Sequence, residues 1–395
     1  MENHPHRALE GLQVVELCDE KVSFCGKLLA DMGARVILVE KPPQAALPAQ
    51  KEGRSRFFAY HHARKQSITL DVEHPQGRSL FLRLISQSDV VLHGLSPAKL
   101  AELSLDYEIL RRKNPGLIMV SLSGFGHDGP RRNWQSCDLV AAATGGWMYV
   151  TGSPLREPLQ PPGNQSFQLA SLYGAVGVLL AVRQKRMTQQ GAHLDLSLQE
   201  CVASSLDHVL PRYLREEEIP GRVGGSNWNH SFFVVPCRDG YIHLAPFQQW
   251  ETLVEWMDSE DMADDLTDEK FLAPDYRLEH LDHIMAIIEG WARTHSREEL
   301  FQTARLMRFA WAPVCTPSEV LASPQLAARG FFEHLPSGEA KGSRLSPGPA
   351  FHSEGAPPPP GPKAPCQGQD NLKIYRDGMG LSSSELQELQ AQGVI

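Results

Sequence analysis

The sequence predicts an α/β fold, with a parallel, doubly wound sheet in a large domain and a second, smaller α+β domain. Over the first 200 of 395 residues, short β-branched and aliphatic runs alternate with segments of helical spacing. This alternation is typical of a parallel sheet wound with helices. Near residue 232 the pattern changes to two apolar runs joined by an Asp-Gly turn. That change predicts an antiparallel hairpin and the start of a separate unit.

The large domain begins with a strand, a helix and a strand, at 12–17, 26–32 and 33–40. Further strands are predicted at 67–71, 89–92, 117–122 and 191–198, with helices at 77–86 and 101–113 and largely helical packing over 141–183. The turn after the first strand reads Cys18-Asp-Glu-Lys-Val-Ser-Phe24 and contains no GxGxxG motif. The sheet therefore lacks the glycine-rich cradle that binds dinucleotide phosphates.

The second domain is predicted from the hairpin at 232–245, helices at 250–257 and 281–295, and a return crossing near 311–314. Residues 343–365 are rich in proline and include Pro357–Pro360. Because proline has no backbone N–H to donate, we expect an extended connector there. Ser382 and Glu385 have the spacing of a capping box, which predicts a short terminal helix.

Composition narrows the functional classes. There are 38 Lys and Arg against 47 Asp and Glu, and no basic stretch is interleaved with aromatics, so we expect no nucleic acid partner. The apolar run 169–182 is shorter than the ~20 residues of a membrane span, and residues 1–7 lack the apolar core of a signal peptide. The cysteines form no CxxC pair and the histidines have no ligand spacing, so we expect reduced thiols and no metal site. These features predict a cytoplasmic protein without membrane contact.

Several motifs follow one another in an order typical of one enzyme family. They are Leu28-Leu-Ala-Asp-Met-Gly-Ala34, Lys65-Gln-Ser-Ile-Thr-Leu-Asp71, Ser121-Leu-Ser-Gly-Phe-Gly-His-Asp-Gly-Pro130, Ala312-Pro-Val314 and Ala328-Arg-Gly330. With these motifs, essentially the whole chain resembles the class III CoA-transferases of the formyl-CoA transferase, or CaiB/BaiF, type. The resemblance implies a Rossmann-like large domain formed by 1–200 and 325–395, a small α+β domain over 225–320, and the connector 343–365. It also implies a dimer of two interlocked, ring-like subunits.

The resemblance further implies covalent catalysis by an aspartate. In the family, this carboxylate attacks an acyl-CoA thioester, and CoA then passes by way of the enzyme to an acceptor acid. The positions that match the aspartate here are Phe167 and Ser166, and the stretch 139–194 holds one acid, Glu157, in an expected loop. A serine ester is a poorer CoA donor than an anhydride, and no histidine lies nearby in sequence to activate Ser166. We therefore expect no nucleophile in this chain.

The positions expected to contact CoA also differ from the family. A phosphate-side arginine aligns with Glu102, whose carboxylate repels a phosphate. Lys41 and Lys65 match basic or retained positions and are the candidate CoA contacts, although lysines outside such a context are usually solvated surface charges. Asp138 matches a family acid near the CoA thiol, and a helix cap explains an aspartate there equally well.

These observations predict a subunit of a heteromeric class III CoA-transferase, such as benzylsuccinate CoA-transferase, that supports a homologous partner bearing the aspartate. Acyl-CoA and a carboxylic acid are the expected substrates, with no covalently bound cofactor. Two alternatives remain open: an active homodimer that uses Glu157 or Asp138, and a non-enzymatic acyl-CoA-binding protein. The related racemases use a histidine and a glutamate where this chain has Cys137 and, approximately, Phe247, so proton exchange at carbon is disfavoured.

Overall fold

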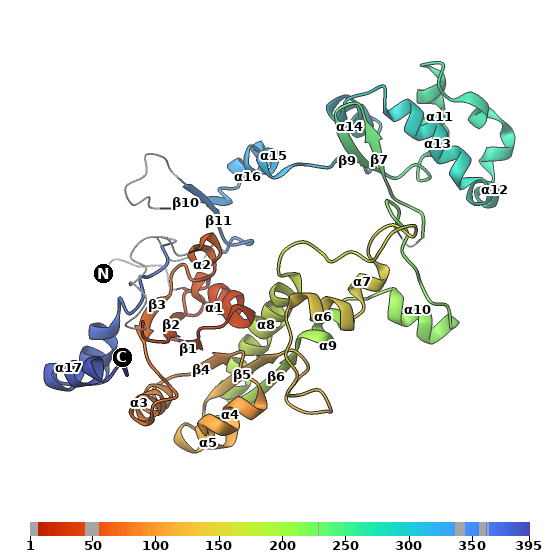
Figure 1. Cartoon of the computed structure of the whole chain (residues 1–395). Helices are drawn as coiled ribbons and strands as arrows, with labels where there is room; N and C mark the ends of the chain where they lie inside the picture. The colour runs from red at the N-terminus through yellow and green to blue at the C-terminus, as the bar shows by residue number, and fades with distance from the viewer. Residues whose placement is uncertain (1–6, 44–54, 228, 336–343, 355–360, 362) are drawn as a thin grey trace. The chain divides into compact units, whose positions relative to one another are not determined.

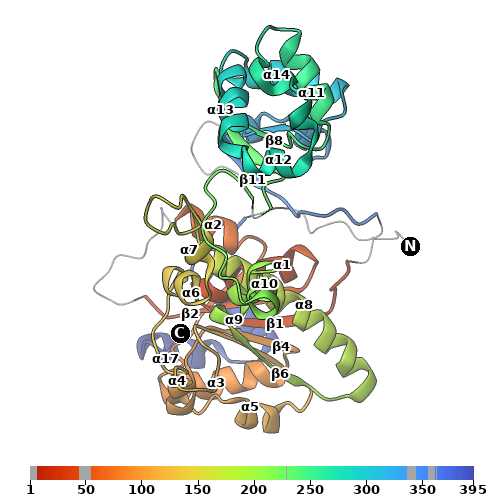
Figure 2. The same ribbon diagram turned by 90° about the vertical axis from the view of Figure 1, so that its right-hand side faces the viewer.

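The computed structural model describes residues 7–43, 55–227, 229–335, 344–354, 361 and 363–395. Contacts divide the chain into two compact units. The first comprises Met1–Trp147, Gln160–Asp207 and Gln325–Ile395, and the second comprises Met148–Leu159 and His208–Pro324. Each unit has its own sheet and hydrophobic core. Figure 1 and Figure 2 show the ribbon of the chain in two orientations.

The first unit is built on a six-stranded parallel sheet of order β3-β2-β1-β4-β5-β6. Its strands are β1 (Gln13–Leu17), β2 (Arg35–Glu40), β3 (Gln66–Thr69), β4 (Val90–His93), β5 (Ile118–Ser123) and β6 (Ala192–Ser197). The strand order reverses between β1 and β4, which makes this the switch point where open α/β sheets bind ligands. The predicted Rossmann-like, doubly wound sheet is confirmed.

Helices cover both faces of this sheet (Figure 2). One core joins Val14 and Val36 to helices α1, α6, α8 and α9, and the other joins Val15 and Ile37 to α3, α4, α5 and the C-terminal helices. Neighbouring strand residues point to opposite faces, so the β1 and β2 runs are apolar without alternation. The helices of this unit are α1 (Glu20–Asp31), α2 (Arg56–His61), α3 (Pro75–Ser86), α4 (Pro97–Leu103), α5 (Tyr107–Lys113), α6 (Asp138–Thr144), α8 (Gln165–Thr188), α9 (Leu198–Ser204), α16 (Pro324–Ala328), the π-helical η3 (Leu372–Gly378) and α17 (Ser383–Ala391).

The prediction of a single helix over 101–113 is wrong, because the structure has two helices there. Helix α4 ends at Leu103, and Ser104 adopts a left-handed conformation with φ of 53°. Asp106 then starts α5, because its carboxylate accepts a hydrogen bond from the Ile109 N–H. At the other end of the chain the predicted capping box is confirmed, since Ser382 and Glu385 together cap α17.

Part of the expected connector forms a strand. β11 (Arg344–Pro347) pairs antiparallel with β10 (Phe332–Leu335). Residues 344–346 have backbone N–H groups to donate, so a ladder forms before the prolines begin. The run Pro357–Pro360 lies outside the described residues.

Helix α8 is the one described helix that is long and apolar enough, by length and composition, to cross a membrane. Its inner side belongs to the core, where Ala170, Ala175 and Val178 are buried and α1 packs against it. Its outer side exposes Leu172 and Leu180. Core packing therefore accounts for the apolar residues of the inner side, and the outer side is an exposed apolar face.

The second unit has a three-stranded antiparallel sheet of order β7-β8-β9. Its elements are α7 (Trp147–Val150, at the boundary), α10 (Val209–Glu216), β7 (Phe233–Cys237), β8 (Gly240–Leu244), α11 (Trp250–Asp258), η1 (Asp264–Thr267), η2 (Glu269–Leu272), α12 (Pro274–Glu279), α13 (Leu281–Ala292), α14 (Arg297–Leu306), β9 (Ala312–Pro313) and α15 (Pro317–Leu321). Residues 148–159 join this unit through the Gly224 N–H, which donates to the Gly152 carbonyl. That tertiary contact has no signature in the local sequence.

The predicted hairpin of the second unit is confirmed, but its glycine has another role. The two loop residues are Arg238 and Asp239, and neither has a positive φ. Gly240 is the first residue of β8, and a Cβ there would lie 2.9 Å from the Nε of Arg297. Glycine therefore allows the Arg297 side chain to approach the strand closely.

Candidate functional site

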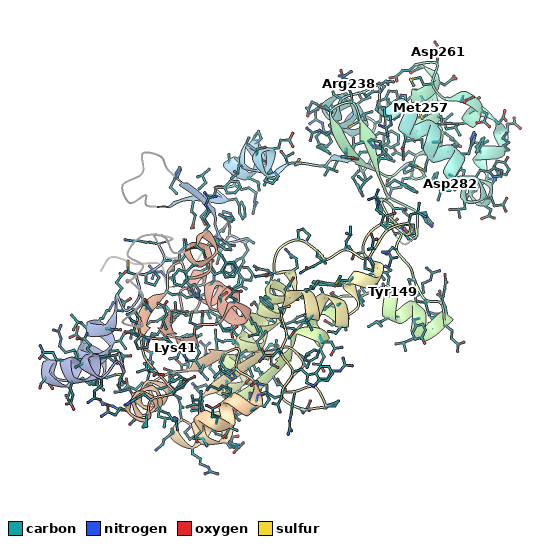
Figure 3. All side chains as sticks on the ribbon, in the orientation of Figure 1. Lys41, Tyr149, Arg238, Met257, Asp261 and Asp282 are labelled. Atoms are coloured by element: carbon teal, nitrogen blue, oxygen red, sulfur yellow. The ribbon has the colours of Figure 1, made fainter. Side chains whose placement is uncertain are left out.

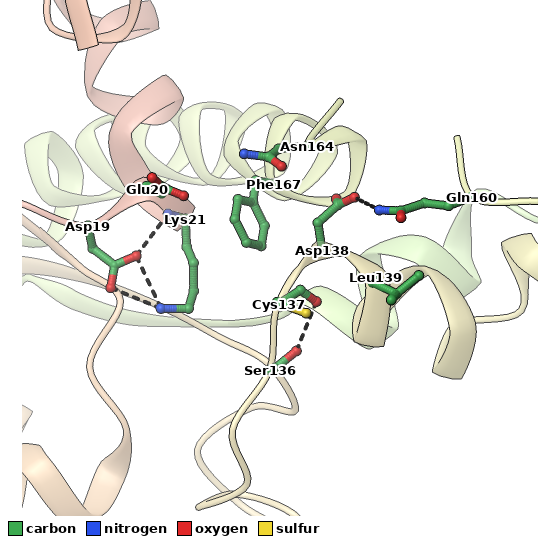
Figure 4. Close-up of a pocket in the computed structure, with 10 residues that line it drawn as sticks. All are labelled: Asp19, Glu20, Lys21, Ser136, Cys137, Asp138, Leu139, Gln160, Asn164 and Phe167. Carbon is green, nitrogen blue, oxygen red and sulfur yellow. Dashed lines mark hydrogen bonds and ion pairs between the residues drawn. The ribbon is translucent and has the colours of Figure 1, made fainter. Parts of the chain in front are cut away.

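A pocket of about 540 Å³ opens at the carboxyl end of β1 in the first unit (Figure 4). Three segments form it: the turn after β1, the start of α6 and the segment that leads into α8. The lining residues are Asp19, Glu20, Lys21, Ser136, Cys137, Asp138, Leu139, Gln160, Asn164 and Phe167. The pocket lies beside the switch point of the sheet, where the fold predicts a ligand.

Asp138 is the anchor of this pocket. It is the first residue of α6 and is buried. Its Oδ1 accepts hydrogen bonds from the Ser166 N–H at 2.8 Å and the Ser166 hydroxyl at 2.6 Å, and its Oδ2 accepts one from the Gln160 amide at 2.6 Å. Asn164, the residue before α8, makes no side-chain cap of its own. Asp138 therefore caps α8 from a neighbouring helix, where a carboxylate is favoured by the helix dipole.

The position matched to the family aspartate presents an aromatic ring to the pocket. Phe167 lines the pocket, and in Figure 4 its ring is drawn between Lys21 and Asp138. Ser166 is fully buried, and its hydroxyl donates to Asp138. Glu157 is exposed and belongs to the second unit. Of the residues considered from the sequence, the structure gathers Asp138, Ser166, Phe167 and Cys137 at the pocket.

The charge of the pocket is mainly negative. Lys21 is the one cation among the ten lining residues, against the carboxylates of Asp19, Glu20 and Asp138. The Lys21 ammonium is already held by Asp19 at 2.9 Å, and it donates to the Gly94 carbonyl at 3.4 Å. An anionic part of a ligand therefore meets repulsion here that a neutral part does not.

Lys65 lies in the protein interior, away from the pocket. Its side chain is 0% exposed, and its ammonium lies 2.7 Å from both carboxylate oxygens of Glu16 and 2.9 Å from the Ser23 carbonyl. Burial raises the pKa of Glu16 to about 7, with Lys65 opposing the shift. Burial also lowers the pKa of Lys65, against the attraction of Glu16. The Lys65 ammonium is enclosed by these groups, which the Lys-x-Ser-Ile pattern did not reveal because Glu16 is 49 residues away, and its contact with CoA stays a prediction.

Lys41 is at the surface, directly after β2, and is labelled in Figure 3. Its side chain is 70% exposed, and its ammonium lies 3.2 Å from Glu73. Lys99 contacts the same carboxylate at 3.1 Å and reaches Glu102 at 2.8 Å. Hydrogen bonds from Lys99 and Lys41 lower the pKa of Glu73. Lys41 is therefore accessible but already paired with a carboxylate, and its contact with CoA stays a prediction.

Some pocket residues carried no signal in the sequence. Gln160 and Asn164 lie in an irregular segment before α8, and only the packing of α6 against α8 brings them to Asp138. Within the described part of the chain, no group of three or more His, Cys, Asp or Glu side chains has an arrangement that could hold a metal ion.

Comparison with known proteins adds to this geometry. The family model "CoA-transferase family III" matches residues 9–371. The succinyl-CoA–D-citramalate CoA-transferase of Chloroflexus aurantiacus is 31% identical, over 99% of both chains. Subunit BbsE of the succinyl-CoA:(R)-benzylsuccinate CoA-transferase of Thauera aromatica is 30% identical over 81% of this chain and 82% of its own.

A solved structure agrees with these relatives. The crystal structure of a CaiB/BaiF family protein from Brucella suis superimposes with a TM-score of 0.84, at 26% identity, over 94% of this chain and 99% of that one. The family model, the two relatives and the solved structure each cover most of the chain. The protein belongs to CoA-transferase family III.

Proposed function

We propose that this chain is a non-catalytic subunit of a heteromeric class III CoA-transferase, and that a homologous partner carries the nucleophilic aspartate. One observation carries the proposal. The helix start that faces the pocket holds Phe167 and a buried Ser166 where the family resemblance places that aspartate. Neither side chain forms an acyl anhydride, so the chain lacks the group on which the transfer depends.

The reaction assigned to the complex needs a carboxylate at two steps. The partner's aspartate attacks the acyl-CoA carbonyl, the C–S bond breaks, and CoA thiolate leaves an acyl-aspartyl anhydride. The thiolate then attacks the aspartyl carbonyl, which releases the donor acid and leaves an aspartyl-CoA thioester. The acceptor carboxylate attacks this thioester to give a second anhydride and free thiolate. The thiolate finally attacks the acceptor carbonyl, which forms the new acyl-CoA and releases the aspartate. The three carboxylates around the pocket of this chain, with Lys21 already paired, suit neither the thiolate nor an acid substrate.

Two further points support a heteromer. The relative BbsE is named as a subunit, and the outer side of α8 exposes apolar side chains, among them Leu172 and Leu180. Both named relatives use succinyl-CoA, so succinyl-CoA is our proposed donor. We further propose the interlocked ring-like dimer and a cytoplasmic location, which follow from the resemblance and the sequence alone.

Reconstitution tests the proposal. The chain, its nearest Asp-bearing homologue from the same genome, and the co-expressed pair are each assayed for CoA transfer from succinyl-CoA to dicarboxylic acids. We expect transfer by the pair, none by this chain alone, and none by a pair in which the partner's aspartate is replaced by alanine. Transfer by this purified chain unaided would refute the proposal.

An active homodimer is the second candidate, because Asp138 lines the pocket. Its three hydrogen bonds occupy both oxygens, which makes the carboxylate a poor nucleophile. An acyl-CoA adduct mapped by peptide mass spectrometry to Asp138, or to the exposed Glu157, would favour this candidate.

A further inference from the structure

A cluster of three histidines and a serine lies where strands β4, β5 and β6 meet. His93 is the last residue of β4 and pairs in register with Ser121 of β5. The Ser121 hydroxyl oxygen is 2.8 Å from the Nε2 of His93 and 2.8 Å from the Nε2 of His193 on β6. The ring centre of His127, in the loop after β5, is 5.9 Å from that of His93 and 5.6 Å from that of His193.

The hydrogen bonds of the cluster have a fixed direction. The Leu95 N–H donates to the Nδ1 of His93 at 3.2 Å, so the proton of the neutral His93 ring is on Nε2. That N–H donates to Ser121, and the Ser121 hydroxyl must in turn donate to His193. The Nε2 of His127 is buried and has no hydrogen-bond partner among the described residues. The arrangement therefore suits neutral rings and offers an added proton no acceptor at His93.

The cluster holds two loops that lead to the pocket. The first is the turn 93–96, in which His93 binds the Leu95 N–H and the Gly94 carbonyl accepts from the pocket residue Lys21. The second is 124–137, where the His127 N–H donates to Asp195 at 2.8 Å. This second loop ends at Ser136 and Cys137, which line the pocket.

Protonation of these rings is disfavoured while the loops are closed. Burial lowers the pKa of His93 to about 3, and burial also lowers the pKa of His127 and of His193. The charge of His127 opposes protonation of His93 and of His193, whose ring centres lie 5.9 Å and 5.6 Å from its own, whereas a hydrogen bond to the Leu95 backbone favours protonation of His127. Among the described residues, three other charged or titratable groups face the cluster. Asp195 of β6 favours protonation of His127 and His193, whereas Lys21 of α1 opposes protonation of His93. Tyr107 of α5 is stacked on His193 and lies beside Arg111 and Glu108.

We propose that His93, Ser121, His127 and His193 form a pH-sensitive latch that keeps the loops 93–96 and 124–137 closed beside the pocket at neutral pH. Opening exposes the rings to water, where the pKa of histidine returns to about 6.5. The open state then binds more protons than the closed state, so acidification below about pH 6.5 favours opening. The latch does not depend on the proposed function, since it concerns access to the pocket and not the transfer step.

Hydrogen exchange measured by mass spectrometry between about pH 5 and pH 8 tests the latch, with rates corrected for intrinsic exchange. In the wild-type chain, we expect the backbone amides of Leu95 and His127, which donate to the Nδ1 of His93 and to Asp195, to lose at least about tenfold protection on acidification, the effect of one pKa unit. The amides of α3, in the same unit as the cluster, must keep their protection, which excludes unfolding of that unit.

Two serines of one strand give a matched pair of variants. Ser121→Ala removes the hydroxyl that joins two histidines, so the Leu95 and His127 amides should exchange rapidly even at neutral pH. Ser123→Ala removes a buried hydroxyl that has no hydrogen-bond partner among the described residues, and it should keep the wild-type profile. His193→Gln, on a half-buried side chain, should flatten the pH dependence. A wild-type profile without pH dependence, or equal profiles for the two serine variants, would contradict the latch.

Discussion

Two lysines show how far a residue's type determines its role. Lys41 and Lys65 both matched positions expected to contact CoA, yet Lys41 is 70% exposed and Lys65 is 0% exposed. The difference arises because the Lys65 ammonium meets Glu16 inside the sheet, whereas Lys41 meets Glu73 in water. A buried ion pair leaves a costly unpaired charge when one partner is removed, and an exposed pair does not.

Lys65→Met should therefore destabilise the first unit by roughly 3–5 kcal/mol, because Glu16 loses its partner while remaining buried. Protonation of Glu16, whose pKa burial raises to about 7, limits the loss as the pH falls. Lys41→Met removes the same charge from the surface and should leave the urea midpoint unchanged. Equal midpoint shifts for the two variants, measured by circular dichroism, would contradict the larger loss of stability expected when the buried pair is broken.

At the residue scale, the sequence singled out the residues at the expected nucleophile position but carried no information on their surroundings. Phe167, Ser166 and Asp138 were singled out from sequence, and the structure places all three at one pocket or bonded to it. The histidine latch had no sequence signal, because strand register alone brings His93, Ser121 and His193 together. These contacts join residues that are 28 and 72 positions apart, which the pattern within one strand does not show.

At the scale of elements, periodicity predicted the parallel strands and most helices of the first unit. It failed where one residue changes the backbone: Ser104 adopts a left-handed conformation, so the expected helix over 101–113 becomes two. It also failed at β11, where a ladder forms before the prolines. Helix α1 shows a further limit of local patterns, because position 26 requires glycine to leave room for the Glu16 side chain of β1. A Cβ at Gly26 would overlap the Glu16 carboxylate.

Alanine substitution at two helical glycines measures that constraint. Gly26→Ala should destabilise the protein by roughly 1–3 kcal/mol, because the buried Glu16–Lys65 pair has no room to move. Gly290→Ala, in α13, meets no atom within 4 Å and should stabilise its unit by roughly 0.5–1 kcal/mol through helix propensity. Urea unfolding of both variants provides the measurement, and a stabilised Gly26→Ala protein would contradict the packing described for α1.

At the scale of the whole molecule, the scaffold of the family is preserved, and the position that the resemblance assigns to the nucleophile holds Phe167 and Ser166. The family model covers residues 9–371, and the sheet, the switch point and the pocket are all present. What the family resemblance places in that pocket as a nucleophile is an aromatic ring in this chain. We propose that such a chain serves a transferase as a structural partner, and the outer side of α8, which exposes Leu172 and Leu180, is consistent with that role.

The most direct test of this account is the intact mass of each chain after covalent trapping. The co-purified pair is incubated with succinyl-CoA, and the enzyme-bound aspartyl thioester is trapped with hydroxylamine or reduced with borohydride. We predict a mass shift on the Asp-bearing partner and none on this chain. A mass shift on this chain would contradict the account and would identify a nucleophile that Phe167 and Ser166 do not provide.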